Sequence, residues 1–156
     1  MSDLDIFDRR LLALVQEDAS LTSEQLGEQV GLSAAACRRR LQSLKKRGVI
    51  EREVALLAPQ AAGNPITVVV QLWLLRDRAD ILDRFAKQIR QAPEVQQCWY
   101  VTGSCDIVMV LSVADMAAYE AFTRAYFLGS QHVKRFETMI SMRRMKFTTA
   151  LPLGLD

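Results

Sequence analysis

Residues 31–47 read GLSAAACRRRLQSLKKR, and this stretch sets the fold predicted for the N-terminal part of the chain. Gly31 is suited to end a helix in a left-handed conformation, and Ser33 is a favoured residue at a helix N-cap. Gly48 provides the next stop signal. The stretch therefore predicts one helix, which begins after Ser33 and ends near Arg47.

The two faces of this helix differ in chemistry. At about 3.6 residues per turn, spacings of three, four and three place a small, apolar set on one face: Ala34, Cys37, Leu41 and Leu44. We expect this face to be buried, which makes Cys37 a core residue and not a reactive thiol. The opposite face holds Ala35 and four polar residues, Arg39, Gln42, Ser43 and Lys46, with Arg38 and Arg40 on its flanks.

Two more helices are predicted upstream, over residues 5–18 and 22–30. Thr22 and Gln25 have the spacing of a capping box, in which each side chain bonds the other residue's backbone N–H group. A short turn containing Gly31 would join the second helix to the third. Two helices joined in this way form a helix-turn-helix.

The distribution of charge indicates a polyanionic partner. Residues 33–52 hold seven basic residues and one acidic residue, whereas residues 1–32 hold two basic and seven acidic residues. Small side chains at the start of a helix allow it to approach base edges, and a forked donor can bond guanine twice. Flanking cations can then meet phosphates. We expect Arg39 and Gln42 to read bases and Arg38 and Arg40 to anchor the backbone of double-stranded DNA. The full predicted interface is Thr22, Ser33, Ala35, Ala36, Arg38, Arg39, Arg40, Gln42, Ser43 and Lys46.

The pattern changes after Gly48. Residues 49–57 are predicted as a strand or small wing, and residues 58–64, APQAAGN, as a linker. The remainder reads as strand 65–75, helix 77–91, strands 95–102 and 106–113, helix 115–127 and strand 133–147. This βαββαβ order predicts a ferredoxin-like α/β sandwich. The fold class is therefore α+β, with a winged helix-turn-helix domain at 1–52, a connection at 53–64 and the sandwich at 65–156.

The predicted sandwich has helices on only one face of its sheet. Apolar residues on the other face, such as Val69 and Trp73, would be exposed in a monomer. We therefore expect two copies of the chain to associate through their sheets.

Composition argues against several other classes of function. The chain has three cysteines, which lack the close spacing of a metal site. His132 is its one histidine, so few residues are available to form a Ser-His-Asp triad. No apolar run approaches the roughly 18 residues needed to cross a bilayer. We expect a cytoplasmic protein with reduced thiols and without a catalytic site, metal, cofactor or membrane contact.

The order and spacing of several motifs resemble the leucine-responsive and asparagine-responsive (Lrp/AsnC) transcription regulators. The resemblance covers essentially the whole chain and rests on residues 4–12 (LDIFDRRLL), 30–33 (VGLS), 40–41 (RL), 55–59 (ALLAP), 101–106 (VTGSCD), 113–116 (VADM) with Tyr119, and 146–152 (KFTTALP). It implies DNA binding by the helix-turn-helix and a C-terminal domain that senses a small-molecule effector. It also implies homodimers that assemble into tetramers or octamers.

Two departures from the family pattern concern specificity. The recognition helix begins with three alanines where the family commonly has Pro and Thr, which affects the preferred operator. The family turn is often Gly-Asp-x-Asp, whereas residues 103–106 read GSCD. This turn still suits an amino acid, because Gly103 can free backbone N–H groups for a carboxylate and Asp106 can pair with an ammonium. Thr138 resembles a family pocket position, and the full predicted effector set is Val101, Gly103, Ser104, Asp106, Thr138 and Ile140.

Other interpretations stay open at the level of sequence. Residues 103–106 also fit a plain hairpin turn. The chain also fits an architectural DNA-wrapping protein that has no effector and reads DNA shape. A redox sensor or enzyme would use Cys98 and Cys105, with Cys105 exposed, but Asp106 would raise a neighbouring thiol pKa and so lower its reactivity.

Overall fold

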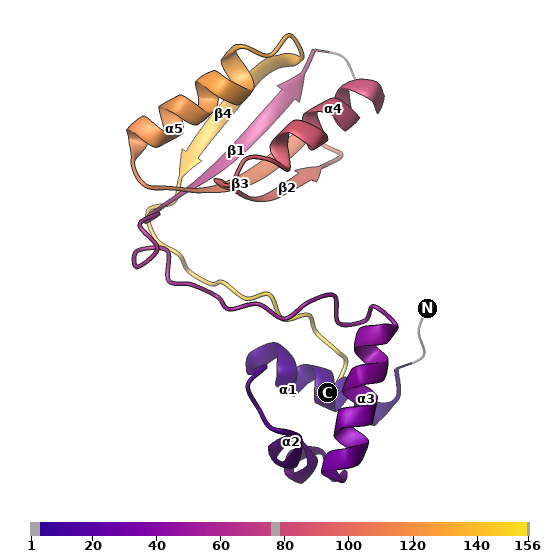
Figure 1. Cartoon of the computed structure of the whole chain (residues 1–156). Coiled ribbons are helices and arrows are strands. Elements are labelled where there is room, and N and C mark those ends of the chain that lie inside the picture. Colours follow the sequence, from indigo (N-terminus) through magenta and orange to yellow (C-terminus); the bar gives the residue numbers. More distant parts are fainter. Residues whose placement is uncertain (1–3, 76–78, 156) are drawn as a thin grey trace. The chain divides into compact units, whose positions relative to one another are not determined.

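The computed structural model describes residues 4–75 and 79–155, which form two compact units (Figure 1). The helical unit runs to Ala55 and also contains the C-terminal segment from Lys146, and the sheet unit spans Leu56–Met145. The expected division placed all of residues 65–156 in one domain. That boundary needs correction at the C-terminus, because the last segment contacts the helical unit. No helix among the described residues is both long enough and apolar enough to cross a membrane.

Three helices make up the helical unit: α1 (Ile6–Glu17), α2 (Ser23–Val30) and α3 (Ala34–Lys46). They meet in a small apolar cluster formed by the buried residues Leu11, Leu26, Val30 and Cys37. Side chains that accept backbone N–H bonds cap all three helices, from Asp5, Thr22 and Ser33. The capping box of Thr22 and Gln25 is confirmed, as is the burial of Cys37.

The sheet unit follows the predicted βαββαβ order. Its elements are β1 (Ile66–Leu74), α4 (Ala79–Ile89), β2 (Val95–Tyr100), β3 (Ile107–Val113), α5 (Met116–Thr123), the π-helical turn η1 (Arg124–Leu128) and β4 (Val133–Ile140). The strands form one antiparallel sheet in the order β2-β3-β1-β4. Central strands β1 and β3 alternate between buried and half-buried residues, so one sheet face is packed and the other is open.

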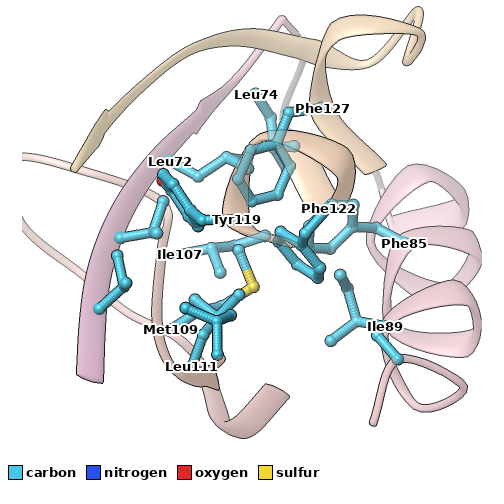
Figure 2. Packing of buried hydrophobic residues seen from close by; sticks show 14 of the residues in the cluster. Leu72, Leu74, Phe85, Ile89, Ile107, Met109, Leu111, Tyr119, Phe122 and Phe127 are labelled. Atoms are coloured by element: carbon cyan, nitrogen blue, oxygen red, sulfur yellow. The ribbon is translucent and has the colours of Figure 1, made fainter. Parts of the chain in front are cut away.

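Both helices of the sheet unit pack against the same face of its sheet (Figures 1 and 2). Figure 2 shows Leu72, Met109 and Leu111 from the sheet meeting Phe85 and Phe122 from the helices. Phe122 also lies edge-on to Phe127, with ring centroids 5.3 Å apart. This apolar layer holds the sheet unit together.

Several predicted boundaries were wrong. Residues 51–58 form neither helix nor strand, and β4 ends at Ile140 where the prediction continued to residue 147. Both segments are exposed. The start of predicted helix 77–91 lies outside the described residues, and α4 begins at Ala79.

Candidate nucleic-acid interface and effector site

The turn before α3 sets the direction of that helix. Gly31 ends α2 with φ 75°, a left-handed conformation that glycine adopts without a steric penalty. Gly27 lies so close to the turn that a Cβ atom there would be 2.4 Å from the carbonyl oxygen of Leu32. Ser33 then starts α3, with its hydroxyl accepting the N–H of Ala36 at 3.2 Å. Together these residues give the tight connection of a helix-turn-helix.

The outward face of α3 carries most of the predicted DNA-binding residues. Ala35, Arg39, Gln42, Ser43 and Lys46 are all exposed, while Cys37 and Leu44 on the other side are buried. Ala36 is half-buried between the two faces. The sorting predicted from helical spacing is therefore present, with small residues at the start of the helix and long donors farther along.

The three adjacent arginines have three different surroundings. Arg39 points outward and is exposed. Arg38 pairs loosely with Glu24 of α2, with Nη2 and Oε1 3.9 Å apart and both side chains more than 60% exposed. An exposed pair of this kind contributes little and is easily exchanged for another anion. Arg40 turns inward toward α1.

Arg40 has two acidic partners on and beside α1 that the sequence did not indicate. Its Nη1 lies 2.7 Å from Oδ2 of Asp5 and 2.7 Å from Oδ1 of Asp8, and Asp8 is only 6% exposed. These bonds, the one to Asp8 foremost, raise the pKa of Arg40, while the backbone N–H of Asp8 and the guanidinium lower the pKa of Asp5. Arg40 lies one turn after Cys37, at the edge of the buried face. Its guanidinium is therefore bonded within the helical unit.

Thr22 and Ser33 lie at the N-termini of α2 and α3. The Thr22 hydroxyl accepts the N–H of Gln25 at 3.3 Å, and the Gln25 side chain accepts the N–H of Thr22 at 2.8 Å. Thr22 and Ser33 are both exposed. Helix N-termini favour anions, so these caps suit contacts to DNA phosphates in addition to their capping role.

In the sheet unit, residues 101–106 form a turn between β2 and β3 that is held in place by hydrogen bonds. Gly103 has φ 142°, in the region that favours glycine. The N–H of Val101 bonds the carbonyl of Asp106 at 2.9 Å, and the N–H of Asp106 bonds the carbonyl of Leu72 at 3.1 Å. Oδ2 of Asp106 accepts the N–H of Leu74 at 2.7 Å. One carboxylate oxygen of Asp106 therefore holds the turn against β1.

Trp73 fastens the same turn and was assigned a different role from sequence. Its indole N–H donates to the carbonyl of Ser104, and the guanidinium of Arg135 stacks 3.6 Å from its ring centroid. From sequence, Trp73 was expected only to add to an apolar surface of the sheet. A lone tryptophan in a strand of aliphatic residues was the available signal, because a buried indole N–H usually finds a partner.

Thr138 and Ile140 lie apart from this turn within one chain. Thr138 pairs with Val70 on one side of β1, whereas the 101–106 turn joins β3 on the other side. At about 4.8 Å per strand spacing, the two groups are roughly 10 Å apart across the sheet. The hydroxyl of Thr138 is bonded to that of Tyr119, whose pKa is raised by burial. The structure thus brings the predicted effector residues to two places.

The cysteines do not form a reactive pair. Cys105 is 6% exposed, which corrects the expectation that it reaches the surface, and Cys98 is exposed on edge strand β2. Partial desolvation raises the pKa of the Cys98 thiol, which lowers its thiolate fraction at neutral pH.

Two family models match the chain. Residues 4–51 match a winged helix-turn-helix DNA-binding model, and residues 67–151 match the Lrp/AsnC ligand binding domain. The chain belongs to the Lrp/AsnC family.

Individual Lrp/AsnC-like proteins align over nearly the full chain. An uncharacterized HTH-type transcriptional regulator, y4tD, of Sinorhizobium fredii is 46% identical over 98% of this chain and 90% of its own length. The DNA-binding transcriptional activator DecR of Escherichia coli K12 is 33% identical, with 96% and 99% of the two chains covered. Transcriptional regulator NMB0573 of Neisseria meningitidis, solved as an L-Met complex, superposes with a TM-score of 0.91 at 31% identity, covering 97% of this chain and 98% of that one.

These similarities fix the broad function of the chain. It is a DNA-binding transcriptional regulator of the Lrp/AsnC family, with a helix-turn-helix and a ligand-binding domain.

Proposed function

We propose that the chain binds specific DNA sequences through the outward face of α3, and that an amino acid modulates this binding or the assembly of the protein. The observation that carries the DNA-binding proposal is the division among the arginines. Arg39 is free and outward, Arg38 is loosely held on the flank, and Arg40 is neutralised by Asp5 and Asp8. The division leaves Arg39 as the forked donor best placed to bond guanine.

The effector proposal rests on the turn at residues 101–106. A free amino acid carries a carboxylate and an ammonium close together. Gly103, with no side chain and a positive φ, leaves backbone N–H groups accessible to the carboxylate. Asp106, already held by Leu74 through Oδ2, would accept the ammonium with its other oxygen. The relative from N. meningitidis was solved with L-Met, which supports an amino acid as the class of ligand.

Self-association would complete this site. The open face of the sheet carries half-buried Val69 and Val110 and the exposed side chains of Trp99 and Met139. Such a face is suited to a second copy of the chain. Because Thr138 and Ile140 are separated from the turn within one chain, we place them in the effector site through a neighbouring copy. Larger assemblies, tetramers or octamers, would follow from further contacts of the same kind, and we place the protein in the cytoplasm.

The first experiment is a thermal-shift screen of the twenty amino acids, followed by calorimetry. An amino acid at about 100 times its Kd should stabilise the protein by about 2.7 kcal/mol. Asp106→Asn keeps an oxygen for the N–H of Leu74 but removes the charge that pairs with the ammonium. We expect it to melt near the wild-type temperature and to weaken effector binding by about 2–5 kcal/mol, or about 30-fold to several thousand-fold.

Two matched variants sharpen this test. Thr138→Val should weaken effector binding by only about 0.5–1.5 kcal/mol, because it loses a neutral hydrogen bond. Ser104→Asp, which restores the commoner family turn, should change the preferred amino acid. Tight binding by Asp106→Asn would move the pocket away from the turn. If no amino acid binds and DNA affinity is uniform across random sequences, the chain is an architectural DNA-wrapping protein.

Sedimentation tests the assembly proposal separately. Trp99→Asp places a charge on the open face without touching the bonds of Trp73 to the turn. We expect smaller, soluble species or loss of solubility, because the charge would be buried without a partner in the interface. An unchanged oligomer would place the interface elsewhere.

A further inference from the structure

The C-terminal segment is bound to α1 by side chains that the sequence motifs do not explain. The side-chain amide of Gln16 donates to the carbonyl of Leu151 at 3.2 Å and accepts the N–H of Leu151 at 2.7 Å. Arg9, two turns earlier on α1, donates from Nη1 to the carbonyl of Leu153 at 2.8 Å. Two side chains of α1 therefore bond the backbone of the tail at alternate residues.

We call these bonds of Gln16 and Arg9 to the backbone of Leu151 and Leu153 the clasp. Their geometry is that of a specific contact. A glutamine amide that bonds both backbone groups of one residue imitates the pairing of a neighbouring strand, and it fixes the tail in register. The guanidinium of Arg9 also donates from Nε to the carbonyl of Leu4, which orients it. Leu12 lies between Arg9 and Gln16 on this face and is 6% exposed, although it is not part of the apolar cluster around Leu11.

The tail is also the direct continuation of β4. After Ile140, the N–H of Ser141 still bonds the carbonyl of Thr67 on β1, and residues 142–149 then contain no helix or strand. The clasp begins at Leu151. The helical unit is thus connected to the sheet unit twice, once through the chain after α3 and once through this tail (Figure 1). Thr138 and Ile140, in the proposed effector site, lie on the strand that leads into the second connection.

We propose that residues 150–153, held by Gln16 and Arg9, form a second tether that transmits the state of β4 to the DNA-binding helices. This rests on the proposed effector function for its second half. With one flexible connection after α3, a shift of β4 would not reach the helical unit. With two connections, a shift of β4 is passed along the tail to α1. Because α1 packs against α2 and α3 in one apolar cluster, the shift reaches the DNA-binding helices.

Hydrogen exchange in the full-length protein tests the clasp without any effector. Gln16→Ala should speed exchange of the Leu151 amide by about fivefold, because its hydrogen bond to the side chain is lost. Glu17→Ala, at the adjacent exposed position of α1, is the matched control and should leave that amide unchanged. Arg9→Ala should loosen residues 152–155 in the same way. Unchanged exchange at Leu151 in Gln16→Ala would overturn the clasp.

DNA binding measured with and without amino acid tests the coupling. Each of the twenty amino acids, L-methionine first, is added to wild type at saturation, and the ratio of the two DNA Kd values is taken. We expect a ratio of about 5–150 in wild type. Gln16→Ala, Arg9→Ala and a chain ending at residue 149 should bring it to within about twofold of one. Their DNA Kd without amino acid and their amino-acid Kd should stay close to the wild-type values.

The outcomes separate the two proposals. A wild-type ratio in Gln16→Ala, together with a loosened tail, would overturn the coupling and leave the effector site standing. If an amino acid binds wild type but none changes its DNA affinity, the coupling fails and the effector site stands. If no amino acid binds at all in the thermal-shift screen, the effector proposal fails and the coupling fails with it. In that case the exchange measurement still decides whether the clasp exists.

Discussion

The helical unit and the sheet unit are stabilised in different ways. The sheet unit has a continuous apolar core in which β1 and β3 pack against α4, α5 and η1. The helical unit has a smaller buried cluster, formed by Leu11, Leu26, Val30 and Cys37 with half-buried neighbours. The helical unit adds local polar contacts: three helix caps, the bonds of Arg40 to Asp5 and Asp8, and the tail held by Gln16. A small domain with little apolar surface depends on each such contact more than a large one does.

The largest expected effect comes from replacing one fully buried leucine by alanine in each unit. Leu11 and Leu111 are each fully buried, and replacing either by alanine should cost about 2–5 kcal/mol. In the helical unit this approaches the whole stability of a small domain, so Leu11→Ala should abolish DNA binding while the sheet unit stays protected from hydrogen exchange. Leu111→Ala should lower the stability of the sheet unit without unfolding it. Simultaneous loss of protection in both units from either variant would show that they unfold as one.

The next comparison is between alanine substitutions at two glycines, one in each unit. Gly27→Ala places a Cβ atom 2.4 Å from a backbone oxygen in the helix-turn-helix, and the turn must shift to relieve it. We expect a cost of about 1–3 kcal/mol, with weakened DNA binding. Gly129→Ala, in the sheet unit, meets its nearest atom at 3.6 Å and should be nearly neutral. Thermal denaturation followed by DNA titration measures both, and equal melting shifts would contradict the close packing at Gly27.

Arg39 tests how the outer face of α3 reads DNA. Arg39→Ala should cost about 1–3 kcal/mol on the preferred site and little on random DNA, because a base contact carries sequence information. Fluorescence anisotropy on the two kinds of DNA gives both values. Equal losses would assign Arg39 to phosphate contacts alone.

Arg38 and Arg40 form a matched pair for salt dependence. Arg38→Ala should weaken binding to all sequences and reduce the slope of log K against log salt by about 0.9. Arg40→Ala should leave that slope unchanged. It should instead destabilise the helical unit by about 1–3 kcal/mol, since it strips the buried carboxylate of Asp8 of its partner. A slope change in Arg40→Ala would restore its role as a phosphate anchor.

The smallest effect concerns thiol chemistry in the sheet unit. Partial desolvation raises the pKa of the exposed Cys98, so at pH 7 its thiolate fraction, and hence its alkylation rate, should be below that of a free cysteine. The rate should rise with pH through the raised pKa. Mass spectrometry after timed alkylation reports it, with Cys37 and Cys105 protected by burial. Rapid labelling of Cys98 at pH 7 would revive the redox interpretation.

Local sequence signals were sufficient where structure is set by neighbours in the chain. The N-caps at Thr22 and Ser33, the stop at Gly31 and the burial of Cys37 and Leu44 depend on spacings of a few residues, and each was predicted correctly. Ala34 and Leu41, expected on the same buried face, are half-buried. The βαββαβ order followed in the same way from alternation and helical periodicity. The family resemblance, which depends on the order of such motifs, was confirmed as well.

Only the tertiary structure decided which charged and polar groups are free. Arg38, Arg39 and Arg40 are equivalent in sequence, and the position of α1 gives Arg40 to Asp5 and Asp8. Sheet order separates Thr138 from the turn at Asp106, although both had been placed in one pocket. The bond between Gln16 and Leu151 joins residues at opposite ends of the chain. Sequence periodicity reports burial along one element, whereas these pairings depend on which elements pack together.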